Sequence, residues 1–419
     1  MAMSHIVIVG GGVIGVCTAY YLAERGARVT IIEKGDIASG CSYGNAGLIV
    51  PSHSVPLAAP GVLWRGIKWM RDPESPFYIR PRLDRDLVRW LWRFRGFCTD
   101  AHLHRAVPVI RDLSHLSLGL FRELAERGTV DSGFRQDGVL MVYRTAAALA
   151  DGHHEARVLG DAGITATVLD GDGARAVEPA LRPDIAGGVY FPDDAHVTPD
   201  RFVIGLGRVV ERMGVTVRTG TEVLGFATAG RRIAAVETTR GDIPCDDVVL
   251  AAGSWSPGVA RGLALDLPIQ AAKGYSITYE QPANGPRVPM LLVESRFAVT
   301  PMRGERVDTL RFGGTLELAG LDLSIDRRRV GAITRGARDY LTLPQEMKLL
   351  EVWRGLRPCT PDGLPLIGRP RRWDNLVVAA GHAMIGLSLG PVTGQLVAQT
   401  IAGEKPLLDL GPLDPDRFA

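Results

Sequence analysis

The pattern of apolar and polar residues at the start of the chain predicts a strand, a helix and a second strand in close succession. A short apolar run at residues 6–9 is followed at once by the glycine-rich stretch GGGVIG at residues 10–15. A helix-like segment then runs through Arg25 to a glycine at position 26, and a second strand-like run ends at Glu33. Short apolar runs bounded by glycine are typical of buried strands, so this order predicts a βαβ unit.

The glycine spacing in this unit matches the fingerprint of a dinucleotide-binding fold. In that fingerprint Gly10 permits the tight turn, Gly12 lets the backbone approach a pyrophosphate, and Gly15 lets the helix pack closely on the sheet. The helix N-terminus offers N–H groups and partial positive charge to the phosphates. Glu33 stands where a carboxylate accepts hydrogen bonds from a ribose, with no arginine beside it to favour a 2′-phosphate. The alternative is a glycine-rich turn in an ordinary α/β sheet.

Two later parts of the chain repeat the alternation of helix and strand. A helical stretch at 200–213 precedes strand-like runs at 215–218 and 248–253, and a strand at 376–380 precedes a helix at 391–402. Gly214 and Gly403 stand where glycine commonly ends a helix. We therefore assign residues 1–50, 197–265 and 350–419 to one Rossmann-like domain.

The two intervening segments predict a second domain. Residues 51–196 contain helical stretches near 84–98 and 103–127 and a strand-like run at 138–143. Residues 266–349 alternate apolar and polar positions, as half-buried antiparallel strands do. The predicted fold class is α/β, with a nucleotide-binding domain built from three chain segments and an α+β substrate domain with an antiparallel sheet. We expect the functional site where the domains meet.

Composition narrows the class of protein. With 419 residues, 46% of them hydrophobic, the chain has room for two or three domains with a substantial core. No run of 18 or more apolar residues is present and the N-terminus lacks the features of a signal peptide, so we expect a cytoplasmic protein. The five cysteines and nine histidines show no ligand-like spacing, which favours reduced thiols and no metal site. A net charge of +2 argues against a nucleic-acid partner.

Four motifs extend over nearly the whole chain in a fixed order. They are GGGVIGV with the following IIEK, ASGCSYGNAG at residues 38–47, LAAGSWS at 250–256, and the pair GLRPCTPD at 355–362 with GHAMIGLS at 381–388. Together they resemble the FAD-dependent amine oxidoreductases, the group that holds D-amino-acid dehydrogenase, glycine oxidase and sarcosine oxidase. SYGNAG, the later VP and PG pairs and the KGY at 273–275 are most similar to the D-amino-acid dehydrogenase branch. D-Hydroxyproline dehydrogenases and glyphosate oxidoreductase share these features, so the branch does not fix a substrate.

The resemblance implies bound FAD. The loop at 38–47 would present donors to the pyrophosphate, and the helix after 386–388 would direct its positive end at the flavin pyrimidine edge. The residues expected to bind FAD are Gly10, Gly12, Val13, Ile14, Gly15, Glu33, Lys34, Ser39, Ser42, Asn45, Ala46, Gly47, Gly253, Trp255, Gly386, Leu387 and Ser388. Sarcosine oxidases tether FAD through a cysteine several residues before Thr-Pro-Asp. Here Gly355 falls near that place and Cys359 directly precedes Thr360, so we expect non-covalent FAD.

The resemblance also implies the reaction, which is oxidative deamination of a D-amino acid or cyclic imino acid. Cα would give a hydride to flavin N5, and the electrons would pass to a quinone or another carrier. Arg357 is the first candidate to hold the substrate carboxylate, because its planar fork matches two oxygens; the alternative is an arginine that pins the C-terminal strands. Tyr275 could donate to the same carboxylate or pack as a rim tyrosine. His53 and His382 could line the pocket. The alternative for His53 is a position on the protein surface, which is the more common one for a histidine in a loop.

Two departures from relatives leave alternatives open. Glycine oxidase presents an arginine after a Val-Pro pair where this chain reads VTPM at 299–302, so Arg303 and Arg311 are reserve candidates for the carboxylate. Sarcosine oxidases place a lysine near flavin N5 for the reaction with oxygen, and no lysine lies between Lys273 and Lys348. This favours a dehydrogenase over an oxygen-using oxidase, although glycine oxidase lacks that lysine too. A non-catalytic nucleotide-sensing Rossmann protein is the third possibility.

One stretch is strongly basic. Residues 65–111 hold eleven Lys or Arg and five acidic residues, and Trp64, Trp69, Trp90 and Trp92 lie in or beside the first half of that stretch. The plainer interpretation is a helix that packs its tryptophans inward and leaves its arginines in water. The sharper hypothesis is peripheral contact with the anionic inner face of a membrane, where a dehydrogenase could reach a quinone.

Overall fold

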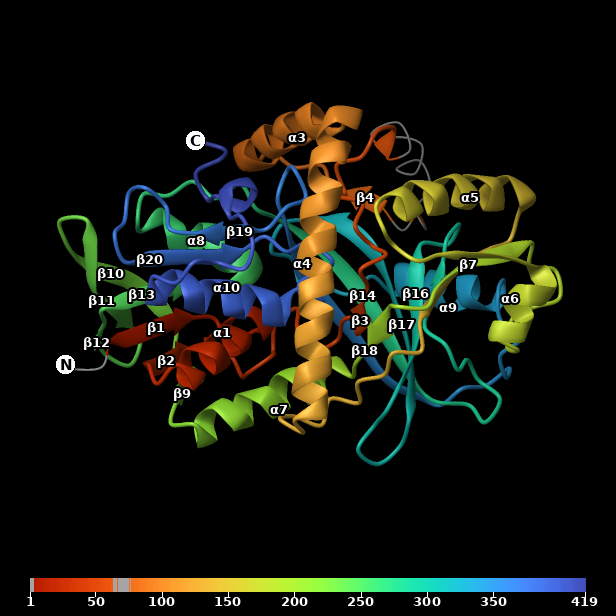
Figure 1. Cartoon of the computed structure of the whole chain (residues 1–419), viewed down its shortest axis with the longest axis horizontal. Helices are drawn as coiled ribbons and strands as arrows, with labels where there is room; N and C mark the ends of the chain where they lie inside the picture. The colour runs from red at the N-terminus through yellow and green to blue at the C-terminus, as the bar shows by residue number, and fades with distance from the viewer. Residues whose placement is uncertain (1–3, 63–65, 67–74, 76) are drawn as a thin grey trace.

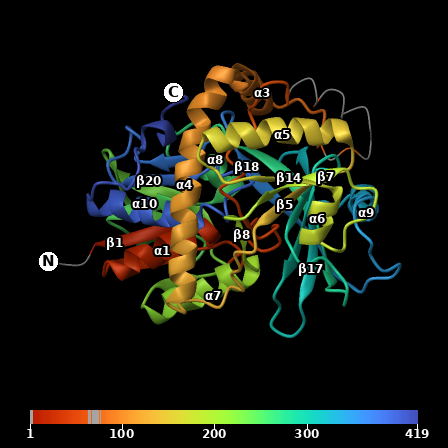
Figure 2. The same cartoon turned by 45° about the vertical axis from the view of Figure 1, so that its right-hand side comes forward.

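The computed structural model describes residues 4–62, 66, 75 and 77–419. Figure 1 shows two sheets beside each other with helices around them, and Figure 2 shows the same arrangement turned by 45°. One sheet has six strands and the other nine, and the described residues also form two smaller sheets of three and two strands. The nucleotide-binding motifs belong to the six-stranded sheet, and the residues predicted to meet substrate belong mainly to the nine-stranded one.

The six-stranded sheet has the order β19-β20-β13-β1-β2-β9, with parallel neighbours except for the antiparallel pair β19–β20. The strands are β1 (His5–Val9), β2 (Arg28–Ile32), β9 (Thr216–Arg218), β13 (Asp247–Leu250), β19 (Leu366–Gly368) and β20 (Leu376–Ala380). They come from three separate parts of the chain. The predicted Rossmann-like sheet is therefore confirmed.

Alternation along these strands buries both faces of the sheet. Ile6 and Ile8 face helices α1 (Val13–Glu24), α7 (Pro199–Arg212) and α10 (Gly390–Ala402), in one continuous core. Val7 and Val9 face the opposite side. That side is covered by α8 (Ser256–Arg261) and by a small antiparallel sheet of β10 (Val223–Ala229), β11 (Arg232–Thr238) and β12 (Ile243–Pro244). α1 is buried on nearly all sides, as its apolar sequence requires.

The nine-stranded sheet has the order β18-β14-β17-β16-β15-β5-β7-β6, and β4 pairs with β17 beside this path. Its strands are β4 (Phe77–Ile79), β5 (Val139–Tyr143), β6 (Thr167–Asp170), β7 (Gly187–Phe191), β14 (Gln270–Glu280), β15 (Met290–Leu292), β16 (Phe297–Met302), β17 (Thr309–Leu318) and β18 (Leu349–Cys359). Only the pairs β5–β15 and β4–β17 are parallel. The predicted antiparallel sheet is therefore present, with α5 (Ala146–Asp161), α6 (Gly171–Val177) and α9 (Arg327–Arg338) packed around it.

Two elements pack outside the domain to which we assigned their chain segments. β18 belongs to the segment 350–419 that we assigned to the Rossmann-like domain, but it pairs along its length with β14 of the large sheet. α4 (Asp100–Glu126) comes from the segment assigned to the substrate domain, but Leu113 and Phe121 of this helix join the core around α1 and α10. Figure 1 shows α4 crossing the middle of the molecule. Its long apolar stripe needs a large partner surface, which the helices of the six-stranded sheet provide.

The remaining elements connect these bodies. α3 (Arg85–Phe97) lies along the top of the molecule in Figure 1, and its N-cap is Asp84, whose carboxylate accepts hydrogen bonds from two N–H groups of the first turn. β3 (Leu48–Ile49) pairs with β8 (Ala195–His196), and short 3-10 turns cover Gly253–Trp255 and Gly411–Leu413. Within the described ranges, no helix combines the length and apolar character needed to cross a membrane.

Candidate active site

The glycine-rich turn after β1 has the close contacts that its spacing predicts. Gly10 has φ +117°, a left-handed conformation that favours glycine. A Cβ atom on Gly15 would lie 1.9 Å from the Gly10 carbonyl oxygen, so only glycine lets α1 approach the turn this closely. Gly12 is the N-cap of α1, and the Val13 N–H donates to Ser42 Oγ at 2.9 Å. The turn and the helix N-terminus therefore lie directly beside the loop at 38–47.

Glu33 lies directly after β2, at the edge where a ribose is expected. Its carboxylate accepts hydrogen bonds from the Gly11 and Gly35 N–H groups at 2.7 and 2.8 Å. These bonds hold the side chain against the glycine-rich turn while leaving carboxylate lone pairs available. Lys34, by contrast, is exposed and pairs with Glu222 at 2.6 Å, so its ammonium is directed to the surface.

The loop at 38–47 is held from both sides. The Asn45 side chain accepts from the Gly47 N–H at 2.9 Å and donates to the Ser42 carbonyl at 3.0 Å. Gly47 has φ +72°, and the Ala46 carbonyl accepts from the Thr300 hydroxyl of β16. The loop is thereby fixed between α1 and the large sheet. Ser39 lies on its exposed side.

The two other FAD motifs adjoin this loop. The Ser388 hydroxyl, just before α10, accepts from the Val50 N–H at 3.2 Å, and Leu387 is buried in the core. An added Cβ on Gly386 would be 3.3 Å from His382. In the 3-10 turn after β13, Gly253 has φ +53° and the Trp255 ring lies near Gly40. The N-terminal ends of α1 and α10 lie side by side, because an added Cβ on Gly390 would be 2.6 Å from the Val13 side chain. Helix N-termini favour anionic ligands.

Arg357 lies in β18 on the face of the large sheet that meets the loop at 38–47, here called the inner face. Its guanidinium lies against Gly274 of β14, where an added Cβ would be 2.2 Å from Nη1. Nη1 donates to the Thr315 carbonyl of β17 at 2.7 Å. Among the described residues this is the one hydrogen bond of the side chain, so most of the fork is free to bind a carboxylate.

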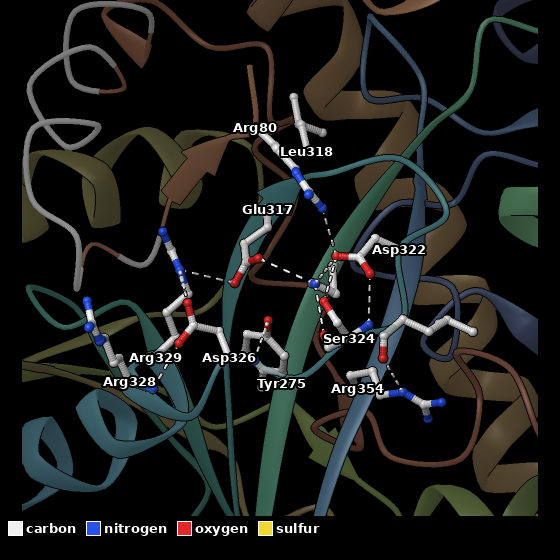
Figure 3. Close-up of polar contacts among 12 residues, drawn as sticks. Arg80, Tyr275, Glu317, Leu318, Asp322, Ser324, Asp326, Arg328, Arg329 and Arg354 are labelled. Atoms are coloured by element: carbon white, nitrogen blue, oxygen red, sulfur yellow. Dashed lines mark hydrogen bonds and ion pairs between the residues drawn. The ribbon is translucent and has the colours of Figure 1, made fainter. Parts of the chain in front are cut away.

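Tyr275 lies on the opposite face of the sheet, here called the outer face, because successive residues of β14 alternate. Its ring is buried in a separate core with Ile277 and Tyr279, and its hydroxyl accepts from the Asp326 N–H at 3.3 Å. Figure 3 shows Tyr275 near Asp326, among the charged side chains of the outer face. The structure therefore does not bring Tyr275 and Arg357 to one substrate group, and the expected shared contact is corrected.

The reserve arginines have other partners. Arg311 is buried on the inner face, where Nε donates to Thr278 Oγ1 and Nη1 donates to the carbonyls of Tyr43 and Asn45. Burial lowers the pKa of its guanidinium. Arg311 therefore ties the large sheet to the loop at 38–47. Arg303 is exposed and pairs with Asp308 at 2.7 Å, away from Arg357.

Of the two histidine candidates, His382 is buried and His53 is partly buried. His53 follows β3, its N–H donates to the Val50 carbonyl, and burial lowers the pKa of its imidazole. Burial also lowers the pKa of His382 to about 3, and this ring is hydrogen-bonded to Thr393 in α10 at 3.0 Å. Both imidazoles are neutral at physiological pH as a result. His53 adjoins Ser52, whose N–H donates to the buried carboxylate of Asp194 at 3.1 Å.

Sequence reasoning missed the part played by Trp353. This residue lies on the inner face of β18, four positions before Arg357, and its ring fills the space beside Gly44 and Gly355. An added Cβ would be 2.2 Å from the ring at Gly44 and 2.1 Å at Gly355. The two glycines belong to separate motifs, and only the fold shows that both make room for one indole.

A family model described as FAD dependent oxidoreductase matches residues 5–400, and the chain belongs to this family. The chain is 33% identical over 422 residues to a D-amino acid dehydrogenase of Granulibacter bethesdensis, with 99% of this chain and 100% of the relative covered. It is 34% identical over 421 residues to a D-amino acid dehydrogenase of Agrobacterium fabrum, with the same coverage.

Solved structures show the same fold. Glycine oxidase from Geobacillus kaustophilus superposes with a TM-score of 0.80 at 24% identity, covering 99% of each chain. L-Proline dehydrogenase from P. horikoshii superposes with a TM-score of 0.76 at 21% identity, covering 99% of this chain and 98% of the other. The protein is thus an FAD-dependent oxidoreductase, and the predicted family and fold class are confirmed.

Proposed function

We propose that this protein oxidises the Cα–N bond of a D-amino acid or cyclic imino acid and passes the electrons to a quinone or another carrier. The observation that carries the proposal is Arg357, whose guanidinium lies on the inner face beside the FAD motifs and makes one hydrogen bond within the described part of the chain. The similarity to proteins named D-amino acid dehydrogenase supports this substrate class. FAD, when bound, supplies the acceptor for a hydride from Cα.

The contribution of the chain is mainly binding and orientation. The Arg357 fork holds the substrate carboxylate through two charge-assisted hydrogen bonds and so fixes the direction of Cα. Trp353 covers the inner face beside this group and keeps water away from the reacting carbon. The neutral imidazole of His53 would line the substrate pocket as an uncharged group. A substrate that arrives with a neutral amine needs no further general base from the protein.

The cofactor is held by the residues of the four motifs without a covalent bond. Gly10 and Gly12 would let the backbone approach the pyrophosphate, Gly15 would keep α1 close to the turn, Glu33 would bind the ribose, and the N-terminus of α10 would face the flavin. Cys359 is buried, and burial raises the pKa of its thiol to about 12, which disfavours the thiolate needed to attack a flavin. Acid precipitation should release the flavin, and flavin that stays in the pellet would contradict this assignment.

The choice of electron acceptor rests on the lysines. Lys273 lies on the outer face, where Nζ contacts Asp322 at 3.0 Å, so it is directed away from the FAD motifs. This position favours a dehydrogenase over an oxidase that uses a lysine beside the flavin. A panel of D-amino acids, including D-proline and the hydroxyproline isomers, should bleach the flavin under anaerobic conditions. Reoxidation by a dye without peroxide supports the dehydrogenase, whereas stoichiometric peroxide indicates an oxidase and no bleaching indicates a sensing protein.

A peripheral membrane contact at α3 would bring the protein to a quinone on the inner face of the membrane. Trp90 is buried and donates to the Cys359 carbonyl, but Trp92 is 71% exposed with the Arg95 guanidinium over its ring. Trp64 and Trp69 lie outside the described residues. Each basic residue near an anionic bilayer contributes ~1 kcal/mol. The protein should sediment with anionic vesicles at low salt, and a protein that stays in the supernatant would refute the contact.

A further inference from the structure

A buried cluster of charged side chains lies on the outer face of the large sheet, directly behind Arg357. Lys273 Nζ contacts Asp322 at 3.0 Å and Glu317 at 3.7 Å, and Arg329 Nε contacts Glu317 at 3.4 Å. Lys273, Glu317 and Arg329 are 3%, 4% and 5% exposed. Figure 3 shows the Glu317 carboxylate between Arg329 on one side and, on the other, the ammonium of Lys273 that also contacts Asp322. Such a cluster is a poor source of stability compared with apolar packing, so a geometric role has to be considered.

The cluster adjoins an irregular point in β17. Lys273 pairs with Glu317 and Tyr275 pairs with Gly314, so Thr315 and the next residue together stand opposite Gly274 alone. This is a β-bulge. Thr315 has φ +65°, which a β-branched residue rarely adopts, and its hydroxyl is buried without a partner in the described structure. Backbone strain of this kind persists only where the surroundings hold it in place.

The bulge connects the two faces of the sheet. On the inner face, the Thr315 carbonyl accepts the Arg357 hydrogen bond at 2.7 Å. Two residues later, the Glu317 carboxylate is held on the outer face by Lys273 and Arg329. The backbone after the bulge also pairs with β4, where the Tyr78 ring lies 4.7 Å from the Arg329 guanidinium. The outer-face contacts therefore hold one end of the bulge whose carbonyl orients the guanidinium.

We propose that Glu317 is a positioning residue for Arg357. The charged cluster keeps the bulge in its strained form, and the Thr315 carbonyl then sets the angle at which the Arg357 fork meets the substrate carboxylate. This inference rests on the proposed function of Arg357. Without the Glu317 charge the bulge relaxes, the fork loses its fixed orientation, and carboxylate binding weakens while flavin binding is retained.

The test uses the flavin-loaded full chain with the substitution Glu317→Gln, which keeps the shape and removes the charge. The dissociation constant of acetate, read from the flavin absorption spectrum, should rise about tenfold, the scale of coupling between groups in one network. KM for the D-amino acid should rise in parallel, with kcat changed less. Glu280→Gln is the matched control, because it removes a carboxylate from an exposed ion pair with Lys348 at the far end of β14. It should leave acetate binding unchanged.

A double substitution separates this inference from the proposed function. In an Arg357→Ala background, Glu317→Gln should have no further effect on acetate, because its effect acts through the arginine. The positioning role would be overturned if Glu317→Gln weakened acetate binding equally with and without Arg357, or did not weaken it at all. Acetate binding that is unaffected by Arg357→Ala itself would instead refute the proposed function. If Glu317→Gln fails to fold with flavin, Arg329→Gln removes one of the cationic partners that hold Glu317, and unchanged acetate binding in that variant overturns the inference.

Discussion

Replacement of Arg357 by alanine is the most direct test of the substrate site. The side chain makes its hydrogen bond to the Thr315 carbonyl and lies against Gly274, and it fills no apolar core. The substitution should therefore leave the fold and the bound flavin intact. It removes a charge-assisted contact to the substrate carboxylate, which contributes ~3 kcal/mol. Since 1.4 kcal/mol corresponds to a factor of ten, kcat/KM should fall by about two orders of magnitude.

The assay is anaerobic reduction of the flavin by the best D-amino acid of the panel, followed by steady-state turnover with a dye. Arg231→Ala serves as the control, because Arg231 is a surface arginine with a carboxylate partner, Asp374, on the far side of the six-stranded sheet. Flavin content and melting temperature are measured for both variants. An Arg357→Ala protein with wild-type kcat/KM would refute the carboxylate role. An Arg357→Ala protein that loses flavin or fails to fold would support the alternative of a structural arginine.

Two further predictions concern the nucleotide turn and a buried acid. Gly15→Ala should reduce the flavin content severely, because its Cβ would lie 1.9 Å from the Gly10 carbonyl oxygen. The control Gly160→Ala in α5 meets open space and should stabilise the fold by about 0.5–1 kcal/mol. Full flavin occupancy in Gly15→Ala would contradict the predicted close approach. Burial raises the pKa of Asp194 from 3.8 to about 7, so the folded state binds more protons than the unfolded state between these values and wild-type stability falls as pH rises from about 4 to about 7. Asp194→Asn should remove up to about 4 kcal/mol of this loss, and melting curves that keep the same pH dependence would show that another group causes it.

Much of the nucleotide-binding half could be predicted from the sequence because its signals are local. Gly10, Gly12 and Gly15 are placed by backbone geometry within a single turn, and the apolar strands around them follow from short hydrophobic runs. The helix at Gly390–Ala402 and its left-handed end at Gly403 were predicted for the same reason. Such features depend on residues a few positions apart, so a linear pattern contains them.

The substrate half was less predictable because its contacts join distant segments. The alternation that identified β14 as a strand did not show which of its faces meets the cofactor, so it could not decide whether Tyr275 contacts the substrate or packs in the core. Arg311 was a reserve candidate for binding the substrate carboxylate, but its N–H groups donate hydrogen bonds to Thr278 and to the loop at 38–47. Neither outcome follows from residue type, since each depends on strand register.

The sequence by itself determined the family, the cofactor class and the order of helices and strands, because glycine spacing and hydrophobic period act over short distances along the chain. Only the tertiary structure decided that β18 joins the large sheet and that α4 crosses to the Rossmann-like core. It also decided that Trp353 fills the space left by two glycines of separate motifs, and that a bulge at Thr315 links Arg357 to charges on the opposite face. These features arise from packing and pairing between residues far apart in sequence, where the free energy depends on the whole fold.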